Sequence, residues 1–236
     1  MTYRHAVCFP SATIEQAKKC AWAWKEKGYI PVIMLDWCHP QVGEMISEFH
    51  SVYSCPWEIF PGYYKVIGHV CKTALEYSNV DLCTAIGDDM LPSEQGAQIH
   101  ADLYFKRFPR GEGVMQCTGD RQGDIINGKF ASERICGSPT FGKEWARKAF
   151  GGKGPFGDYG FKSFYCDEML KCVAEKLGLL YQEPALSIHH AHWSWGWMQK
   201  QPYHERAQKN WDHDRELFDK LKAEGFPGHE LLTEIF

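Results

Sequence analysis

The hydrophobic pattern of the first part of the chain alternates between short apolar runs and amphipathic stretches. Apolar runs at 5–9, 30–35 and 81–86 predict buried strands, each of which ends in a turn or loop. Between them, apolar residues at helical spacing predict two helices, one over 13–28 and one over 64–78. Strand–loop units separated by helices favour an α/β fold with a mixed, mainly parallel sheet.

The second part of the chain is less regular. We expect strands at 114–118, around Ile135 and at 186–193, and helices at 167–177 and 202–224. A glycine-dense segment at 151–160 interrupts this pattern, and it is too short and too aromatic for a linker between domains. Its composition predicts a mobile flap beside the binding crevice.

Composition and cysteine usage narrow the class of protein. The 236 residues carry a formal net charge of −4, so no global basic field announces nucleic-acid binding. The ten cysteines are scattered and form no C-x-x-C pair, which favours free thiols in a reducing cytosol. Residues 1–10 contain no long apolar segment, and no run reaches the roughly 18 apolar residues of a membrane span. We therefore expect a soluble, cytoplasmic protein.

Acidic residues follow the third predicted strand, where Asp88 and Asp89 are adjacent. The other two strands end at Pro10–Ser11 and at Asp36, and the carboxyl ends of parallel strands meet at one sheet edge, where ligands bind. Two neighbouring carboxylates repel each other, so the pair is most stable when it shares a cation. Mg²⁺ or Mn²⁺ held there would bridge the phosphates of a nucleoside diphosphate. The alternative is a solvated turn whose aspartates cap a helix.

A histidine run supplies a second candidate group, His189, His190 and His192. In an extended strand His190 and His192 share one face, and His189 points to the other. Neutral imidazole is a ligand for Mn²⁺ or Zn²⁺, so His190 or His192 is the expected partner of the two aspartates. The alternative is a surface strand with hydrogen-bonded histidines.

Asp167 and Glu168 open a predicted helix after the glycine-dense segment. Sugar transfer with inversion needs a carboxylate that takes the proton of the acceptor hydroxyl. Acidic residues are also favoured in the first turn of any helix, so a purely structural role stays open. Lys65, near the start of the 64–78 helix, faces either a phosphate group or solvent.

Taken in chain order, these motifs resemble those of the GT-A glycosyltransferases, especially the large family-2-like group. Segment 86–90 reads IGDDM and is similar to the D-x-D-type motif of that group. Segment 166–170 reads CDEML and is similar to its E-D helix-start motif, and the histidine strand is similar to its late metal ligand. The sequence departs from the pattern in three places. Gly-Asp-Asp-Met replaces D-x-D, Asp-Glu inverts E-D, and the Tyr-Asn that commonly follows the first strand in the family is missing beside Ser11.

The resemblance covers residues 3–195, and it implies a GT-A (Rossmann-like) fold with a mainly parallel sheet flanked by helices and a C-terminal helix. It implies one catalytic domain over 1–236, with a nucleotide-binding half at 1–92, an acceptor and metal half at 93–196, and a helical tail at 197–236. The implied site residues, with Lys65 added for its place near the crevice, fall into three groups: Pro10, Ser11, Asp36, Lys65 and Asp88 for the nucleotide sugar; Asp89 with His190 or His192 for Mn²⁺ or Mg²⁺; and Asp167 or Glu168 for the base.

The implied function is transfer of a sugar from a nucleotide-diphosphate sugar, with UDP favoured, to an unidentified acceptor hydroxyl with inversion. A metal-dependent hydrolase or nucleotidyltransferase would use the same aspartates and histidines and is the main alternative. An interaction module without enzymatic activity is a further one. A modified base in DNA is one candidate acceptor, because basic residues run through the middle of the chain: Lys106, Arg107, Arg110, Arg121, Lys129 and Arg134.

Overall fold

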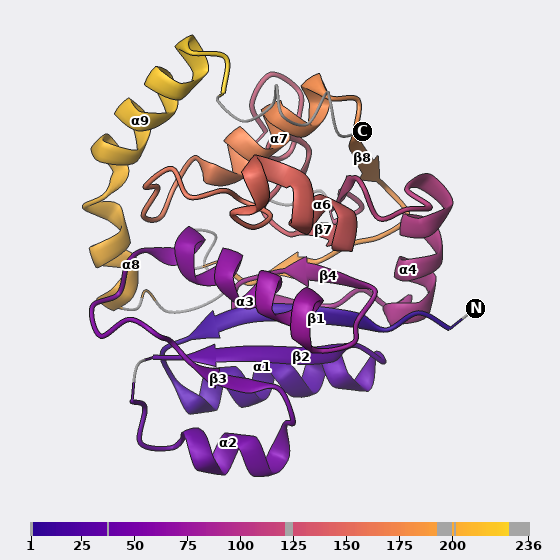
Figure 1. Ribbon diagram of the computed structural model, residues 1–236, viewed down its shortest axis with the longest axis vertical. Helices are drawn as coiled ribbons and strands as arrows, with labels where there is room; N and C mark the ends of the chain where they lie inside the picture. The colour runs from indigo at the N-terminus through magenta and orange to yellow at the C-terminus, as the bar shows by residue number, and fades with distance from the viewer. Residues whose placement is uncertain (1, 37, 121–124, 193–199, 201, 227–236) are drawn as a thin grey trace.

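A mixed sheet runs through the middle of the molecule. The computed structural model describes residues 2–36, 38–120, 125–192, 200 and 202–226. Within them the sheet contains β1 (His5–Ser11), β2 (Ile30–Leu35), β3 (Val52–Ser54), β4 (Leu82–Ala85), β6 (Val114–Cys117), β7 (Pro139–Gly142) and β8 (Leu180–Glu183). Their order is β3-β2-β1-β4-β7-β6-β8 (Figure 1). β7 is antiparallel to both of its neighbours, and the other described strands of the sheet run the same way.

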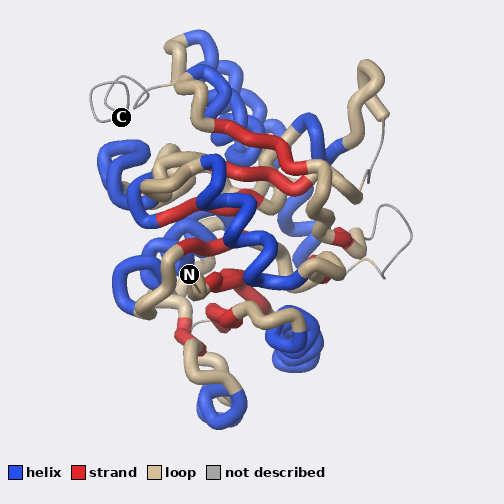
Figure 2. Tube along the Cα trace, turned by 90° about the vertical axis from the view of Figure 1, so that its right-hand side faces the viewer, coloured by secondary structure: helices blue, strands red, loops and turns tan. Residues whose placement is uncertain are grey.

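Helices cover both faces of this sheet, as the edge-on view in Figure 2 shows. One face packs against α1 (Ile14–Glu26), α2 (Val42–Glu48) and α4 (Gly96–Arg107). The other packs against α3 (Tyr63–Tyr77), α6 (Lys143–Lys148), α7 (Cys166–Lys176) and α9 (Trp211–Ala223). Two short helices, α5 (Ala131–Arg134) and α8 (Pro202–Gln208), and the 3₁₀ turn η1 (Ala149–Gly152) complete the described helical segments.

The double covering explains why the central strands read as continuous apolar runs. In β1, Ala6 and Cys8 belong to the core on the α3 side, whereas Val7 and Phe9 belong to the core on the α1 side. All four side chains are completely buried. The expected α/β fold with a mixed, mainly parallel sheet, flanking helices and a C-terminal helix is confirmed.

A small ribbon lies apart from the main sheet. β5 (Met90–Leu91) follows β4 closely and pairs antiparallel with β9 (His189–His190), a segment about a hundred residues later in the chain. Met90 lies opposite His190, and Leu91 lies opposite His189. The ribbon therefore brings the histidine segment to the loop that carries the two aspartates.

Two expected strands of the second part are wrong in extent or place. Ile135 ends the short helix α5, and the strand of this region is β7, whose first residue is Pro139. The expected strand at 186–193 shrinks to His189–His190, because the chain here has only the two-residue β5 as a partner; its last residue, Trp193, lies outside the described residues. The strand that extends the sheet is instead β8, ahead of it in the chain.

The glycine-dense segment is anchored in the core, contrary to the expected mobile flap. Phe150 and Phe156 are buried within the same apolar cluster as α3. The indole Nε1 of Trp145 donates a hydrogen bond to the carbonyl of Pro155 at 3.1 Å. Phe156, between the glycines, and Phe150, directly before the first of them, thus hold the segment against the core. The expected tail helix is also divided, because a turn separates α8 from α9.

A buried polar chain crosses the centre of the sheet. The His5 ring contacts the Thr84 hydroxyl at 2.8 Å, Thr84 contacts Thr140 at 2.7 Å, and Thr140 contacts the His100 ring at 2.9 Å. The hydroxyl of Tyr29 lies 3.0 Å from the other nitrogen of His100. Burial lowers the pKa of His100 to about 3, so this histidine is neutral in the folded protein at neutral pH.

The ten cysteines are free thiols, and most of them are buried. Among the described helices, none combines the length and the apolar character that crossing a lipid bilayer requires.

Candidate functional site

The two aspartates lie directly beyond β4, at the sheet edge toward which β1 and β2 also run. Asp88 accepts a hydrogen bond on Oδ2 from the Ser11 hydroxyl at 2.6 Å. The backbone carbonyl of Asp88 accepts another from the Gln16 side chain at 2.7 Å. The end of β1 and the first turn of α1 therefore hold the aspartate turn in place. Ser11 and Asp88 meet as expected, whereas the sequence does not predict the contact of Gln16 with the aspartate turn.

His190 reaches the second aspartate across the β5–β9 ribbon. Its Nε2 atom lies 3.2 Å from Oδ2 of Asp89, and the backbone carbonyl of Asp89 accepts a hydrogen bond from Ala191 at 2.9 Å. The side chains of His190 and Asp89 are 27% and 11% exposed, so the pair is largely shielded from solvent. The ring of His192 lies 4.9 Å from that of His190, centroid to centroid. Asp89, His190 and His192 are thus brought together as the sequence predicts.

Burial and neighbouring charge set different protonation states for these groups. Burial raises the pKa of Asp88 to about 6; the hydrogen bond from Ser11 opposes this rise, and the charge of Asp89 adds to it. Burial also acts on Asp89, but the hydrogen bond and charge of His190 outweigh it and lower the pKa of Asp89. Burial, followed by the charge of His190, lowers the pKa of His192 to about 4. Carboxylate and imidazole groups are ligand types that suit a divalent cation such as Mn²⁺ or Mg²⁺. Among the described residues, however, no three ligand atoms of Asp88, Asp89, His190 and His192 lie within 4.8 Å of one another.

Tyr63 connects this group with the start of α7. Its hydroxyl donates a hydrogen bond to the carbonyl of Ile86 at 3.0 Å, beneath the aspartate turn. Burial raises the pKa of Tyr63, and the negative charges of Asp89 and Asp167 are among those that raise it further. Both carboxylates therefore lie within electrostatic reach of one phenol. Sequence reasoning missed Tyr63, because an aromatic residue at the start of a helix gives no functional signal.

Asp167 and Glu168, adjacent in sequence, have different surroundings. Burial raises the pKa of Asp167, and a hydrogen bond with Tyr64 opposes the rise. Burial and the charge of Asp167 raise the pKa of Glu168, while Arg134 and Lys222 are among the cations that lower it. Asp167 thus lies against Tyr64 in the first turn of α3, whereas Glu168 lies among basic side chains of α5 and α9.

The loop that leads into α7 is held by one buried carboxylate of α9. Asp214 is completely buried. It accepts hydrogen bonds from the backbone N–H groups of Lys162 at 3.0 and 3.2 Å, Ser163 at 2.7 Å and Phe164 at 2.9 Å. The carbonyl of Lys162 in turn accepts a hydrogen bond from the N–H of Tyr63 at 2.6 Å. We call residues 162–164 with Asp214 the α9 clamp; it ties the beginnings of α3 and α7 together.

The remaining expected nucleotide-binding residues lie at the same edge or close to it. Pro10 precedes Ser11 in β1, and Asp36 is exposed just after β2, where its charge affects Cys55 beyond β3. Lys65 is turned elsewhere, because its ammonium group forms an ion pair with Asp158 of the glycine-dense segment at 3.2 Å. The structure therefore places Asp36 farther along the edge and does not bring Lys65 into contact with the aspartates.

Tyr203 of α8 is a further neighbour of the site. Burial raises its pKa, and the charges of Asp88 and Asp89 add to the rise, so the phenol is within electrostatic reach of both. The ring of the adjacent His204 lies 6.1 Å from that of His192. The sequence predicts a helix over 202–224 but indicates no site residue in it.

The basic residues from the middle of the chain do not form one patch. Lys106 and Arg107 end α4, and Arg110 follows them before β6 begins, at the sheet edge opposite the aspartates (Figure 1). Lys129 and Arg134 come after β6, toward the edge that carries the aspartates. Arg121 lies outside the described residues. The basic residues that favoured DNA as the acceptor therefore lie at two opposite edges of the sheet.

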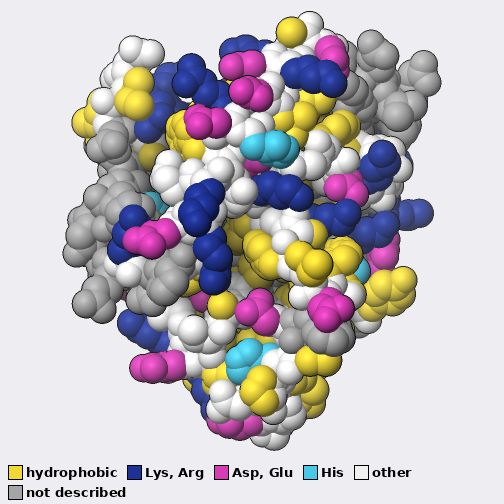
Figure 3. All heavy atoms as spheres, turned by 90° about the vertical axis from the view of Figure 1, so that its left-hand side faces the viewer, with side chains coloured by type: hydrophobic (Ala, Val, Ile, Leu, Met, Phe, Trp, Pro, Cys, Tyr) yellow, Lys and Arg dark blue, Asp and Glu magenta, His cyan; other side chains and the backbone are white. Residues whose placement is uncertain are grey.

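The face at the carboxyl ends of the strands has mixed chemistry. Figure 3 shows Lys and Arg side chains gathered around the middle of this face, beside a group of hydrophobic side chains, with acidic and histidine side chains among them. Such a surface can contact both an anionic phosphate group and the flat face of a sugar or base.

The chain matches no protein-family model and no curated protein. Among solved structures it is similar to a TarS fragment from S. aureus in complex with UDP. The identity is 8%, the TM-score is 0.45, and the alignment covers 76% of this chain and 57% of that one. It is also similar to 4-diphosphocytidyl-2C-methyl-D-erythritol synthase, with 9% identity, a TM-score of 0.46, and coverage of 78% and 90%.

A glycosyltransferase involved in the glycosylation of the major capsid of PBCV-1 is similar as well, with 9% identity, a TM-score of 0.34, and coverage of 60% and 61%. Because each TM-score is below 0.5, the chain's own residues carry the functional proposal.

Proposed function

We propose that the chain is a divalent-cation-dependent glycosyltransferase that uses a nucleotide-diphosphate sugar. The observation that carries the proposal is the convergence of Asp88, Asp89 and His190 at the carboxyl edge of the sheet, where Ser11 of the neighbouring strand joins them. Asp89 and His190 are separated by 101 residues in sequence, so their meeting is a product of the fold. Ligands of α/β sheets bind at this edge.

Asp89 and His190 would hold Mn²⁺ or Mg²⁺, with Asp88 or His192 beside them. When bound, the cation would neutralise the charge that develops on the departing nucleoside diphosphate. Asp88 accepts a hydrogen bond from the Ser11 hydroxyl, and it would lie close to the ribose or the sugar of the donor. UDP is the favoured nucleotide, and Asp36, exposed farther along the edge, would accept a hydrogen bond from the base or ribose.

Asp167 would act as the base that accepts the proton of the acceptor hydroxyl. Its burial raises its pKa, which suits a carboxylate that must take up a proton near neutral pH. The hydrogen bond with Tyr64 would orient the carboxylate, and the α9 clamp would fix the start of the helix that carries it. Glu168 is the weaker candidate, because burial and Asp167 raise its pKa but the nearby cations Arg134, Lys222 and Lys171 oppose that rise. A single base on the acceptor side implies inversion at the anomeric carbon.

The first experiment measures thermal unfolding with UDP, with Mn²⁺, and with both. A rise in Tm that needs both ligands is expected, because the cation and the diphosphate bind as a unit. Asp89→Asn and His190→Ala should each remove this rise, whereas Asp102→Asn, an exposed position on α4 at the far edge, should keep it. Absence of any shift with every nucleoside diphosphate would exclude the proposal.

The second experiment distinguishes transfer from the alternative reactions. Nucleotide sugars are incubated with Mn²⁺ and a panel of hydroxyl acceptors, and release of nucleoside diphosphate is followed together with the glycosylated product. Transferred sugar supports the proposal. Release of phosphate or pyrophosphate without a glycosylated product would assign the site to a hydrolase or a nucleotidyltransferase.

A further inference from the structure

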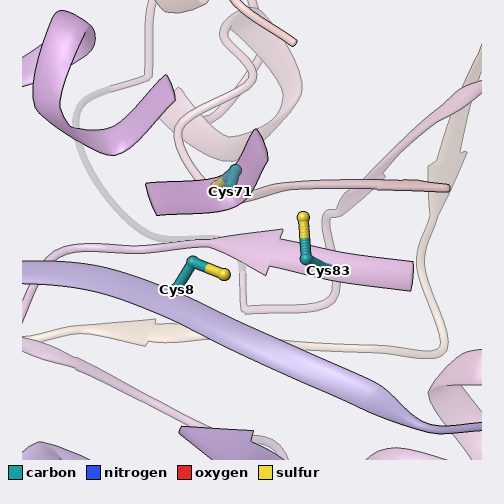
Figure 4. Close-up of side chains that lie close together, drawn as sticks. All are labelled: Cys8, Cys71 and Cys83. Atoms are coloured by element: carbon teal, nitrogen blue, oxygen red, sulfur yellow. The ribbon is translucent and has the colours of Figure 1, made fainter. Parts of the chain in front are cut away.

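Three cysteine thiols converge in the core, outside the site at the sheet edge. Cys8 of β1, Cys83 of β4 and Cys71 of α3 place their Sγ atoms within 4.8 Å of one another. Figure 4 shows Cys8 and Cys83 on the two strands and Cys71 on the helix above them, with the sulfur of Cys83 turned toward the helix. All three side chains are completely buried. We call these residues the thiol cluster.

The backbone fixes this convergence. Ala6 pairs with Cys83 and Cys8 pairs with Ala85, so the two strand cysteines are diagonal neighbours on the α3 face of adjacent parallel strands. Cys71 lies in the middle of α3, a fifteen-residue helix that packs on both strands. No chain movement is needed to bring the three sulfur atoms to one point.

The surroundings are apolar, and the thiols interact chiefly with one another. Burial opposes ionisation of Cys8, whereas its interactions with Cys71 and Cys83 lower its pKa. Burial, followed by the other two thiols, raises the pKa of Cys71. None of the groups that shift these three values is a lysine, arginine or histidine. A charged complex in this position would therefore have no counter-charge.

Charge balance and ligand number select the ion that suits such a site. Structural Zn²⁺ takes four ligands, and three thiolates around it would leave a net negative charge in the apolar core. Cu(I) is thiophilic, but three thiolates would leave a larger negative charge around it. A trivalent, thiophilic metalloid with three thiolates is neutral and needs no fourth ligand.

We propose that Cys8, Cys71 and Cys83 form a buried binding site for trivalent arsenic, taken up as arsenous acid. Three S–H bonds and three As–O bonds break, three As–S bonds form, and three water molecules leave. Arsenic stays trivalent and no charge is buried, so the step needs no oxidant or reductant. The bound atom would link β1, β4 and α3, and thereby stabilise the sheet and the helix that carries Tyr63 and Tyr64.

The test incubates the reduced protein with arsenite and measures bound arsenic by native mass spectrometry, together with Tm. We expect one arsenic atom per chain and a raised Tm. Cys71→Ala should bind arsenite at least about tenfold more weakly, because it removes a direct ligand. Loss of a residue that only supports a ligand already weakens metal binding by about tenfold or more. Cys136→Ala removes a buried cysteine outside the cluster and should bind like the wild type.

Arsenic X-ray absorption of the wild-type complex gives a second measurement, which holds even where Cys71→Ala does not fold. Three sulfur neighbours are expected. Two or fewer sulfur neighbours, equal binding by the Cys71→Ala and Cys136→Ala variants, or a Tm that rises with Zn²⁺ and not with arsenite would overturn the proposal. The test uses no nucleotide, so its outcome is independent of the proposed transferase activity.

Discussion

Replacing Asp214 by asparagine removes the charge at the centre of the α9 clamp while keeping nearly the same shape. The carboxylate accepts hydrogen bonds from three successive backbone N–H groups, those of residues 162–164. Its Oδ1 atom also lies 2.8 Å from Nδ1 of His213. An asparagine has one acceptor oxygen, and its amide nitrogen would face N–H donors.

The size of the effect follows from counting donors. One amide oxygen accepts two hydrogen bonds at most, so at least one N–H of the loop loses its partner, at a cost of about 1–3 kcal/mol. The hydrogen bonds that remain lose the assistance of the negative charge, and each becomes roughly half as strong. Together these losses give an expected destabilisation of about 3–5 kcal/mol, which lowers Tm by roughly 6–20 °C in a chain of this size.

Urea unfolding of Asp214→Asn measures this loss, and Asp219→Asn is the matched control. Asp219 lies on the same helix but is exposed, so its substitution should change stability by no more than about 0.5 kcal/mol. Amide hydrogen exchange should also accelerate selectively at residues 162–164 of Asp214→Asn. Equal stability of the two variants would show that the clamp does not hold the loop.

Other perturbations give smaller sets of expectations. Gly62→Ala should lower the free energy of unfolding in urea by about 2 kcal/mol or more. The φ of +117° at this position is strained for alanine, and a Cβ would come within 2.7 Å of a backbone atom of Lys162. The control Gly43→Ala, which has open space around its Cβ, should leave stability unchanged or raise it slightly. The pKa of His100 is about 3 in the folded protein and 6.5 when the side chain is exposed, so the unfolded chain binds more protons below pH 6.5. The free energy of unfolding should therefore fall by on the order of 3 kcal/mol between pH 7 and pH 4. His100→Gln should flatten that profile in urea titrations, and an unchanged slope would contradict the assignment. Asp167→Asn should abolish sugar transfer while the thermal shift with UDP and Mn²⁺ persists, and Glu168→Gln should keep most of the turnover; the reverse pattern would exchange their roles.

The elements that the sequence predicts well have strong apolar periodicity. β1, β2, β4 and α3 are read within two residues of their ends, because both faces of these strands and one face of the helix are buried. α4 is missed for the opposite reason. Its buried positions include Gly96, Ala97 and His100, which are small or polar, so its inner face gives no hydrophobic signal.

β7 and β8 are missed because of their composition. β7 contains Pro139 and Gly142, which read as a turn, although proline is accepted at the first residue of a strand. β8 borders only one neighbouring strand and is half-exposed, so its pattern is weak. An apolar run predicts a strand only when the core covers both of its faces.

The residues of the candidate site likewise fall into those that the sequence indicates and those that only the fold reveals. Asp88, Asp89 and His190 are visible in the sequence, because acidic and histidine residues next to apolar runs give a local signal. Tyr63 and Asp214 act through contacts with residues far along the chain, and nothing in their own neighbourhood indicates those contacts. Such residues emerge only when the fold is known.

The β5–β9 ribbon has a consequence for the order in which the protein matures. A chain emerging from the ribosome through β8 would already contain Ser11 and both aspartates, but the imidazole of His190 would still be missing. The pairing of Met90 with His190 also determines which side chain lies beside Asp89. A shift of β9 by one residue would place His189 or Ala191 there instead of His190. Under the proposed function, competence to bind a cation would therefore be acquired late in synthesis, and the register of two backbone pairs would control it.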